Sequence, residues 1–194
     1  LTGFSANGCE TQDDVSVIVN PLPIIDPGAP FSVCEGSEVT LTATGAGPGA
    51  SYAWSNDVIN GVPFSLDVTN EYTVIGTDAN GCTGTASLMV TGIPNPDALF
   101  SANPISGVIP LNVDFQNLTT NATDYSWDFG NGDSLNYAEP NAPVISSVYN
   151  DVGIYAVILT AFNQLCSDTY TLEIDANLIG DPIIVVPNVF SPHI

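Results

Sequence analysis

The side chains able to do chemistry in this sequence are of few kinds. It holds 21 Asp and Glu, four Cys and one His, and no Lys or Arg. The single His is His193, in the terminal tail, so neither a Ser-His-Asp triad nor a Cys-His pair can stand on a fixed scaffold. A carboxylate pair for glycoside hydrolysis is formally available, but no insertion suggests a cleft to hold it. We therefore predict that the chain is not an enzyme.

The missing cations exclude several classes of partner. The formal net charge is −21. Nucleic-acid binding needs Lys or Arg to displace phosphate counterions, and phosphate-binding loops need a Lys. Anionic membrane surfaces would repel the chain, and no apolar run reaches the ~18 residues of a membrane span. We expect no nucleic-acid partner and no membrane insertion.

Composition and periodicity favour strands. Hydrophobic residues make up 44% of the chain and charged residues 11%, with 17 Gly and 15 Pro. Residues 39–43 and 170–174 alternate apolar and polar side chains, as half-buried strands do. Asn7-Gly8 and Asn80-Gly81 are typical of tight hairpin turns. Together these features predict an all-β chain of immunoglobulin-like sandwiches, with Trp54 and Trp127 as core residues.

An internal repeat defines the domain boundaries. Residues 1–21 match residues 74–94, 73 positions later, and Tyr52-x-Trp54 matches Tyr125-x-Trp127 at the same distance. Proline-containing joints separate the modules and should make them a semi-rigid string. The predicted organisation is a final hairpin of an incomplete module (1–21), a complete immunoglobulin-like module (22–94), a divergent module (95–178) and an extended tail (179–194).

The divergent module carries a family signature. Residues 125–133 read Tyr-Ser-Trp-Asp-Phe-Gly-Asn-Gly-Asp. This segment resembles the Trp-Asp-Phe-Gly-Asp-Gly signature of the polycystic-kidney-disease (PKD) domain, with Asn131 in place of the usual Asp. Tyr149 and Gly153-x-Tyr155 also stand where that family places them. The resemblance covers roughly residues 96–176 and implies a PKD-like β-sandwich.

Two further resemblances concern the cellular context. Residues 24–93, with Cys34-Glu35-Gly36 and the run from Gly76 to Cys82, are similar to immunoglobulin-like repeats of secreted surface proteins of Bacteroidota. Residues 186–192 resemble the start of the gliding-motility-associated C-terminal domain used in type IX secretion. These resemblances imply an extracellular or cell-surface stalk or adhesive protein, whose partners are copies of itself or surface glycans and proteins. The alternative is a set of glycan-binding accessory modules of a secreted polysaccharide-degrading enzyme.

The cysteines support an oxidising location. Cys34 and Cys82 belong to the same predicted module, so a disulfide between them is expected; the alternative is two free buried thiols. Cys9 should pair with a residue in the missing part of its own module. Cys166 has no obvious partner.

Three residues of the signature segment are candidate calcium ligands. Asp128, Asn131 and Asp133 alternate with Gly in a tight turn, as oxygen ligands do in calcium loops. The alternative is a turn whose side chains cap their own backbone. No other cofactor is expected.

Asp133-Ser134-Leu135 resembles the short O-glycosylation motif of Bacteroidota and makes Ser134 a candidate acceptor; the alternative is an ordinary loop serine.

The two ends of the chain suggest a filament. Residues 1–21 supply only two strands, which cannot bury a core alone. Residues 183–190 are apolar and are expected to be extended, so they could complete such a module in another molecule by strand addition. The alternative is that both ends belong to a fragment.

Overall fold

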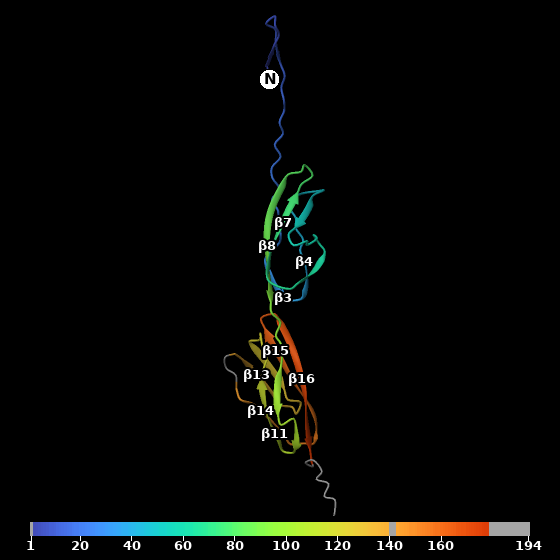
Figure 1. Ribbon diagram of the computed structural model, residues 1–194, viewed down its shortest axis with the longest axis vertical. Coiled ribbons are helices and arrows are strands. Elements are labelled where there is room, and N and C mark those ends of the chain that lie inside the picture. Colours follow the sequence, from blue (N-terminus) through green and yellow to red (C-terminus); the bar gives the residue numbers. More distant parts are fainter. Residues whose placement is uncertain (1, 140–142, 179–194) are drawn as a thin grey trace, which may run out of the picture. The chain divides into compact units, whose positions relative to one another are not determined.

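The computed structural model describes residues 2–139 and 143–178 and contains strands but no helix within these ranges (Figure 1). It divides into two compact units, Leu1–Ser32 with Gly36–Thr91 and Val33–Glu35 with Gly92–Ile194. The predicted all-β class is confirmed. None of the described residues form a helix long and apolar enough to span a bilayer. The predicted tail, 179–194, lies outside the described residues.

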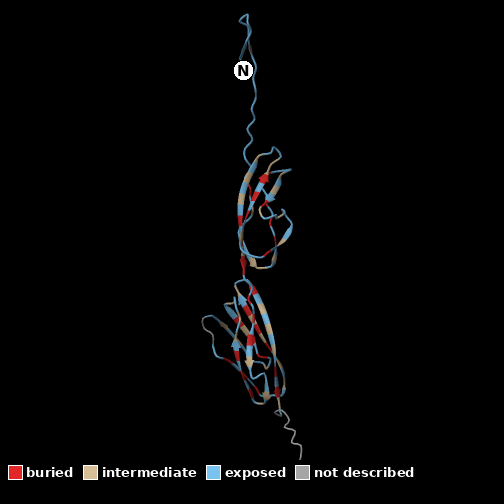
Figure 2. Cartoon of the chain, viewed as in Figure 1, coloured by how far each residue is buried: buried red, intermediate tan, exposed pale blue. Residues whose placement is uncertain are grey.

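The first unit begins with an isolated hairpin of β1 (Thr2–Phe4) and β2 (Glu10–Gln12). Its turn is closed by the Ser5 amide, which donates to the Cys9 carbonyl at 2.9 Å. Every residue from 2 to 22 whose burial is described is exposed (Figure 2). Because the hairpin buries none of these side chains, it has no core of its own.

The remainder of the first unit is an immunoglobulin-like sandwich. A four-stranded sheet has the order β3-β8-β7-β5, and a two-stranded sheet pairs β4 with β6. Strand β8 passes from the first unit into the second. The strands are β3 (Phe31–Cys34), β4 (Ser37–Thr40), β5 (Ser51–Trp54), β6 (Pro63–Leu66), β7 (Asn70–Thr77) and β8 (Thr83–Ile93).

Trp54 anchors the core of this sandwich, as the sequence predicted. It is 7% exposed and lies opposite Val74, which is fully buried. Its indole Nε1 donates to Asn60 Oδ1 at 3.0 Å, and the same oxygen accepts the Ala43 amide at 2.8 Å. One asparagine oxygen therefore satisfies two donors at the edge of the core and holds the loop that carries it.

The second unit contains a larger sandwich of two sheets. A five-stranded sheet has the order β10-β16-β15-β12-β13, and a three-stranded sheet has the order β14-β11-β9. Alternating burial along β11 and β14 turns one face of the smaller sheet towards the core. The strands are β9 (Phe100–Asn103), β10 (Ser106–Val108), β11 (Leu111–Asn117), β12 (Asp124–Asp128), β13 (Ser134–Ala138), β14 (Ile145–Tyr149), β15 (Gly153–Asn163) and β16 (Cys166–Asn177).

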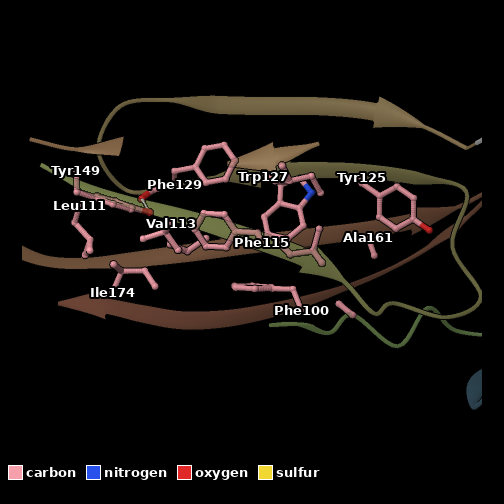
Figure 3. Packing of buried hydrophobic residues seen from close by; sticks show 14 of the residues in the cluster. Phe100, Leu111, Val113, Phe115, Tyr125, Trp127, Phe129, Tyr149, Ala161 and Ile174 are labelled. Atoms are coloured by element: carbon pink, nitrogen blue, oxygen red, sulfur yellow. Dashed lines mark hydrogen bonds between the residues drawn. The ribbon is translucent and has the colours of Figure 1, made fainter. Parts of the chain in front are cut away.

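Trp127 lies at the centre of this second core (Figure 3). It is fully buried, and its ring centroid lies 4.8 Å from that of Phe100 and 5.8 Å from that of Phe115. Phe129 stacks nearly parallel to it at 6.0 Å. Tilted aromatic pairs of this kind add to the area that they bury. The prediction that Trp127 is a core residue is confirmed.

Candidate functional site

The signature segment forms a tight turn between β12 and β13. Asp128 Oδ1 accepts the Gly130 amide at 2.9 Å, and Asn131 Oδ1 accepts the Asp133 amide at 3.0 Å. Each side chain thereby caps the backbone two residues further on, which is how Asp and Asn stabilise turns.

Asn131 also ties this turn to β14. Its Nδ2 donates to Ser147 Oγ at 2.9 Å and to the Val148 carbonyl at 3.2 Å. An ionised Asp has no hydrogen to donate, so it could accept the Ser147 hydroxyl but could not bond the Val148 carbonyl. The departure from the PKD signature at Asn131 therefore has a physical reason in this chain.

The three candidate calcium ligands are gathered in this one turn. One oxygen of Asp128 and the amide oxygen of Asn131 are used by the backbone, and Asn131 Nδ2 also lies 3.4 Å from Asp133 Oδ2. Within the described ranges, no three or more His, Cys, Asp or Glu side chains gather to hold a metal. The turn bonds that the alternative required are present, and calcium binding stays a prediction.

Ser134, the candidate glycosylation site, begins β13 and is exposed. It lies opposite Asp128 in the antiparallel register. Its hydroxyl is thus on the surface beside the acidic turn, and its modification stays a prediction.

A buried tyrosine supports the same turn from inside. Tyr149, the last residue of β14, is fully buried, and its hydroxyl donates to the Phe129 carbonyl at 3.1 Å (Figure 3). Burial, reinforced by the neighbouring Tyr155 and Asp133, raises the pKa of Tyr149 to about 12, against a smaller lowering by Ser147. The family resemblance pointed to Tyr149 but not to this bond, because its partner is a backbone carbonyl 20 residues away.

The cysteines pair differently from the prediction. Cys34 is bonded to Cys166, with a Cα–Cα distance of 5.8 Å. Cys34 ends β3 of the immunoglobulin-like sheet, but the short segment Val33–Glu35 clusters with the second unit, to which Cys166 also belongs. Cys82 is partly buried, Cys9 is exposed, and both are free thiols. The predicted Cys34–Cys82 bond is therefore wrong, and Cys166, which had no expected partner, has one.

The strand geometry explains this correction. The Glu35 amide donates to the Ile93 carbonyl at 2.9 Å, which places Cys34 beside the last residue of β8. Cys82 precedes the first residue of the same strand. At about 3.3 Å per residue, the two ends of β8 are roughly 33 Å apart, far beyond the reach of a disulfide.

Comparison with known proteins agrees with these folds. Residues 98–176 match the family model of the PKD domain, so the second unit contains a PKD domain. No curated protein sequence matches the chain. PKD and immunoglobulin-like domains are typically non-catalytic modules, and together with a disulfide they are typical of extracellular proteins.

Three solved structures are similar to parts of the chain. The PKD1 domain of the Vibrio cholerae metalloprotease PrtV is 30% identical, with a TM-score of 0.34, over 43% of this chain and 98% of that chain. An E-to-A variant of titin domains I67–I69 is 14% identical, with a TM-score of 0.42, over 80% of this chain and 65% of that chain. The amphioxus IgVJ-C2 molecule is 13% identical, with a TM-score of 0.35, over 75% of this chain and 99% of that chain.

Gly130 and Gly132 offer a matched pair for testing the turn. Both have positive φ, +75° and +97°, but a Cβ on Gly130 would lie 2.8 Å from the Ala156 carbonyl oxygen, whereas a Cβ on Gly132 meets nothing within 4 Å. Gly132→Ala should cost about 1 kcal/mol of backbone strain. Gly130→Ala should cost at least about 1 kcal/mol more, because backbone must move as well. Urea unfolding of the two variants measures the difference, and equal losses would contradict the close approach.

Tyr149 should make stability fall at high pH. Its folded pKa is about 12, above its ordinary value of 10.0, so the unfolded chain releases this proton first. The contribution is complete below pH 10 and is lost as the pH rises from 10 to 12. No Lys titrates in this window. Thermal unfolding should therefore show Tm falling more steeply above pH 10 in the natural chain than in Tyr149→Phe. Parallel curves would contradict this role of Tyr149.

Proposed function

We propose that the chain is a non-catalytic structural or adhesive part of an extracellular protein, in which immunoglobulin-like and PKD modules follow one another as a stalk. The PKD match, the immunoglobulin-like fold and the disulfide support this proposal. Export by type IX secretion is part of the same proposal and rests on residues 186–192, outside the described residues.

The disulfide is the observation that carries the proposal. Cys34 and Cys166 are 132 positions apart in the sequence. Tension applied to the chain before Cys34 and after Cys166 passes through the bond between them, because a covalent bond is shorter and stiffer than the loop it closes. Residues 35–165 are then never stretched, even if their strands separate. Under tension that would unfold the sandwiches, a stalk built this way can lengthen only by the residues outside 34–166.

Single-molecule force spectroscopy on the full chain, held at its two ends, tests this property. In the oxidised chain, unfolding should release only the residues outside 34–166. Reduction, or the double variant Cys34→Ser with Cys166→Ser, should add roughly 430–470 Å of releasable length at about 3.3–3.6 Å per residue. The single variant Cys82→Ser is the matched control and should behave as the natural chain. Full extension of the oxidised chain would refute the proposal.

We also propose that molecules join end to end by strand complementation. The exposed segment after β2 supports this idea. Val15 and Val17 are 87% and 77% exposed, whereas their counterparts 73 positions later, Leu88 and Val90, are 3% and 0% exposed. The segment thus presents apolar side chains that a complete module buries, and added strands would cover them.

The proposed donor is residues 183–190, outside the described residues. This segment is apolar (Ile-Ile-Val-Val-Pro-Asn-Val-Phe) and belongs to the opposite end of the same sequence. Because donor and acceptor are different surfaces, the contact would propagate head to tail.

Electron microscopy of the full chain and of a variant lacking residues 181–194 tests the joining. Filaments or rings are expected for the full chain only. A second variant, Val15→Asp with Val17→Asp, should also abolish assembly, because charge on the acceptor face cannot be covered. Single particles from the full chain, or filaments that survive the deletion, would reject strand exchange through this tail.

A further inference from the structure

The free thiol of Cys82 stands at a defined place in the strand register of its module. Trp54 on β5 lies opposite Val74 on β7, and Val74 lies opposite Ala86 on β8. Cys82 comes four residues before Ala86, directly after the turn between β7 and β8.

The bonded Cys166 stands at the same place in the PKD module. Trp127 on β12 lies opposite Leu159 on β15, and Leu159 lies opposite Tyr170 on β16. Cys166 comes four residues before Tyr170, again directly after the turn. Counted from the core tryptophan, Cys82 and Cys166 are therefore equivalent positions.

The two cysteines also share the face of their strand. Cys82 is in phase with Leu88 and Val90, which are 3% and 0% exposed, and Cys166 is in phase with Ile174, which is fully buried. Successive side chains alternate between the faces of a strand. Both thiols are thus on the inward-facing row at the turn end of the last hairpin.

Cys9 repeats the position a third time. The pair Phe4–Glu10 in the first hairpin corresponds to Thr77–Thr83, each residue 73 positions later. The Cys9 amide donates to a side-chain oxygen four residues earlier, at 3.1 Å, and the Cys82 amide does the same at 2.8 Å. Cys9, Cys82 and Cys166 therefore occupy equivalent positions in the last hairpins of three modules. The bond of Cys166 to Cys34 shows which kind of cysteine this position pairs with.

Cys34, the other cysteine of the bond, can also be matched to a position in the PKD domain. The Glu35 amide donates to the Ile93 carbonyl at 2.9 Å, and the Ile109 amide donates to the Asn177 carbonyl at 3.0 Å. Ile93 and Asn177 are each seven residues beyond Ala86 and Tyr170. Cys34, one residue before Glu35, is thus the counterpart of Val108 in the PKD domain.

The PKD domain therefore has the hairpin cysteine but carries a valine where the immunoglobulin-like module carries its first-strand cysteine. The immunoglobulin-like module has both cysteines. Its first-strand cysteine is bonded to the hairpin cysteine of the module that follows in the sequence, and its own hairpin cysteine is free.

We propose that Cys82 and Cys9 are disulfide sites for the first-strand cysteine of other immunoglobulin-like modules. By the register of Cys34–Cys166, the partner of Cys82 is a cysteine at the end of the first strand of a module of the kind that ends in residues 1–21. By the same rule, the partner of Cys9 is the first-strand cysteine of the module that precedes the one ending in residues 1–21. The rule links each module to the next and ends at the PKD domain, which lacks the first-strand cysteine. This inference stands whether or not the chain bears tension.

The bond forms by thiol–disulfide exchange with a disulfide oxidant. Two thiols each lose a proton, their sulfurs join, and the oxidant accepts two electrons and two protons and leaves as two thiols. The exposed Cys9 and the partly buried Cys82 are reachable for this exchange. Oxidised glutathione is a sufficient oxidant for the test below.

A full chain with one extra copy of residues 22–94 inserted before residue 22 supplies the missing partner. Ser32→Ala and Thr83→Ser in the first copy, both at exposed positions, distinguish the peptides of the two copies by mass. After oxidation with glutathione disulfide, mapping uses a Glu-specific and then an aromatic-specific protease, because the chain has no tryptic sites and no Glu separates Cys82 of the first copy from Cys34 of the second, whereas Phe31 does. We expect the first copy's Cys34 bonded to the second copy's Cys82, and the second copy's Cys34 bonded to Cys166.

The control changes Cys82→Ser in the second copy only. The first copy's Cys34 should then be alkylated without reduction, whereas the bond to Cys166 should persist and report correct folding in the same sample. If the expected pair forms between two molecules, seen as a dimer on a non-reducing gel, the site is confirmed and its donor is placed on another chain. A bond between Cys34 and Cys82 of one copy, or an alkylated second-copy Cys82 beside an intact Cys166 bond, would overturn the proposal.

A second variant tests the same rule without a second immunoglobulin-like module. It carries an extra copy of residues 95–178 after residue 178 and Val108→Cys in the first copy. The register predicts a bond from the new cysteine to the second copy's Cys166. Two free thiols at these positions in a folded chain would contradict the rule.

Discussion

Each complete module is organised around a tryptophan buried between two sheets. In the PKD domain, Trp127 packs against Phe100 and Phe115 and lies opposite Leu159, which in turn lies opposite Tyr170. A slip of one residue would turn every side chain of these strands to the other face, so burial of the indole sets the register of the last hairpin. The position of Cys166 at the end of that hairpin follows from this register.

The absence of Lys and Arg changes how polar groups are satisfied. Asparagine side-chain amides donate several hydrogen bonds each, as Lys and Arg side chains do in other proteins. Asn163 Nδ2 donates to the carbonyls of Pro94 and Asn121 at 2.7 and 2.8 Å, and Asn131 joins the acidic turn to β14. These bonds carry no charge, so salt does not screen them and titration of the carboxylates does not break them. Among the described residues no Asp or Glu is buried, so these acids set the surface charge.

Much of the fold could be predicted because it is local in the sequence. Alternation of apolar and polar residues gives the strands, Asn-Gly pairs give the turns, and the conserved spacing within the repeat locates Trp54 and Trp127. The PKD signature named the second domain, and the turn-capping roles of Asp128 and Asn131 follow from residues two positions apart. Each of these signals needs a window of only a few residues, or a comparison of the sequence with itself.

The sequence by itself determined the all-β class, the PKD domain and the two core tryptophans. Only the tertiary structure decided which cysteines meet. Cys34 and Cys82 are in one module, yet the length of β8 separates them, whereas Cys34 and Cys166 are 132 positions apart and bonded. The same holds for the hydroxyl of Tyr149 and the carbonyl of Phe129. The physical reason is that the distance between two residues in space depends on which way the strands run and which strands pair. A short stretch of sequence specifies neither.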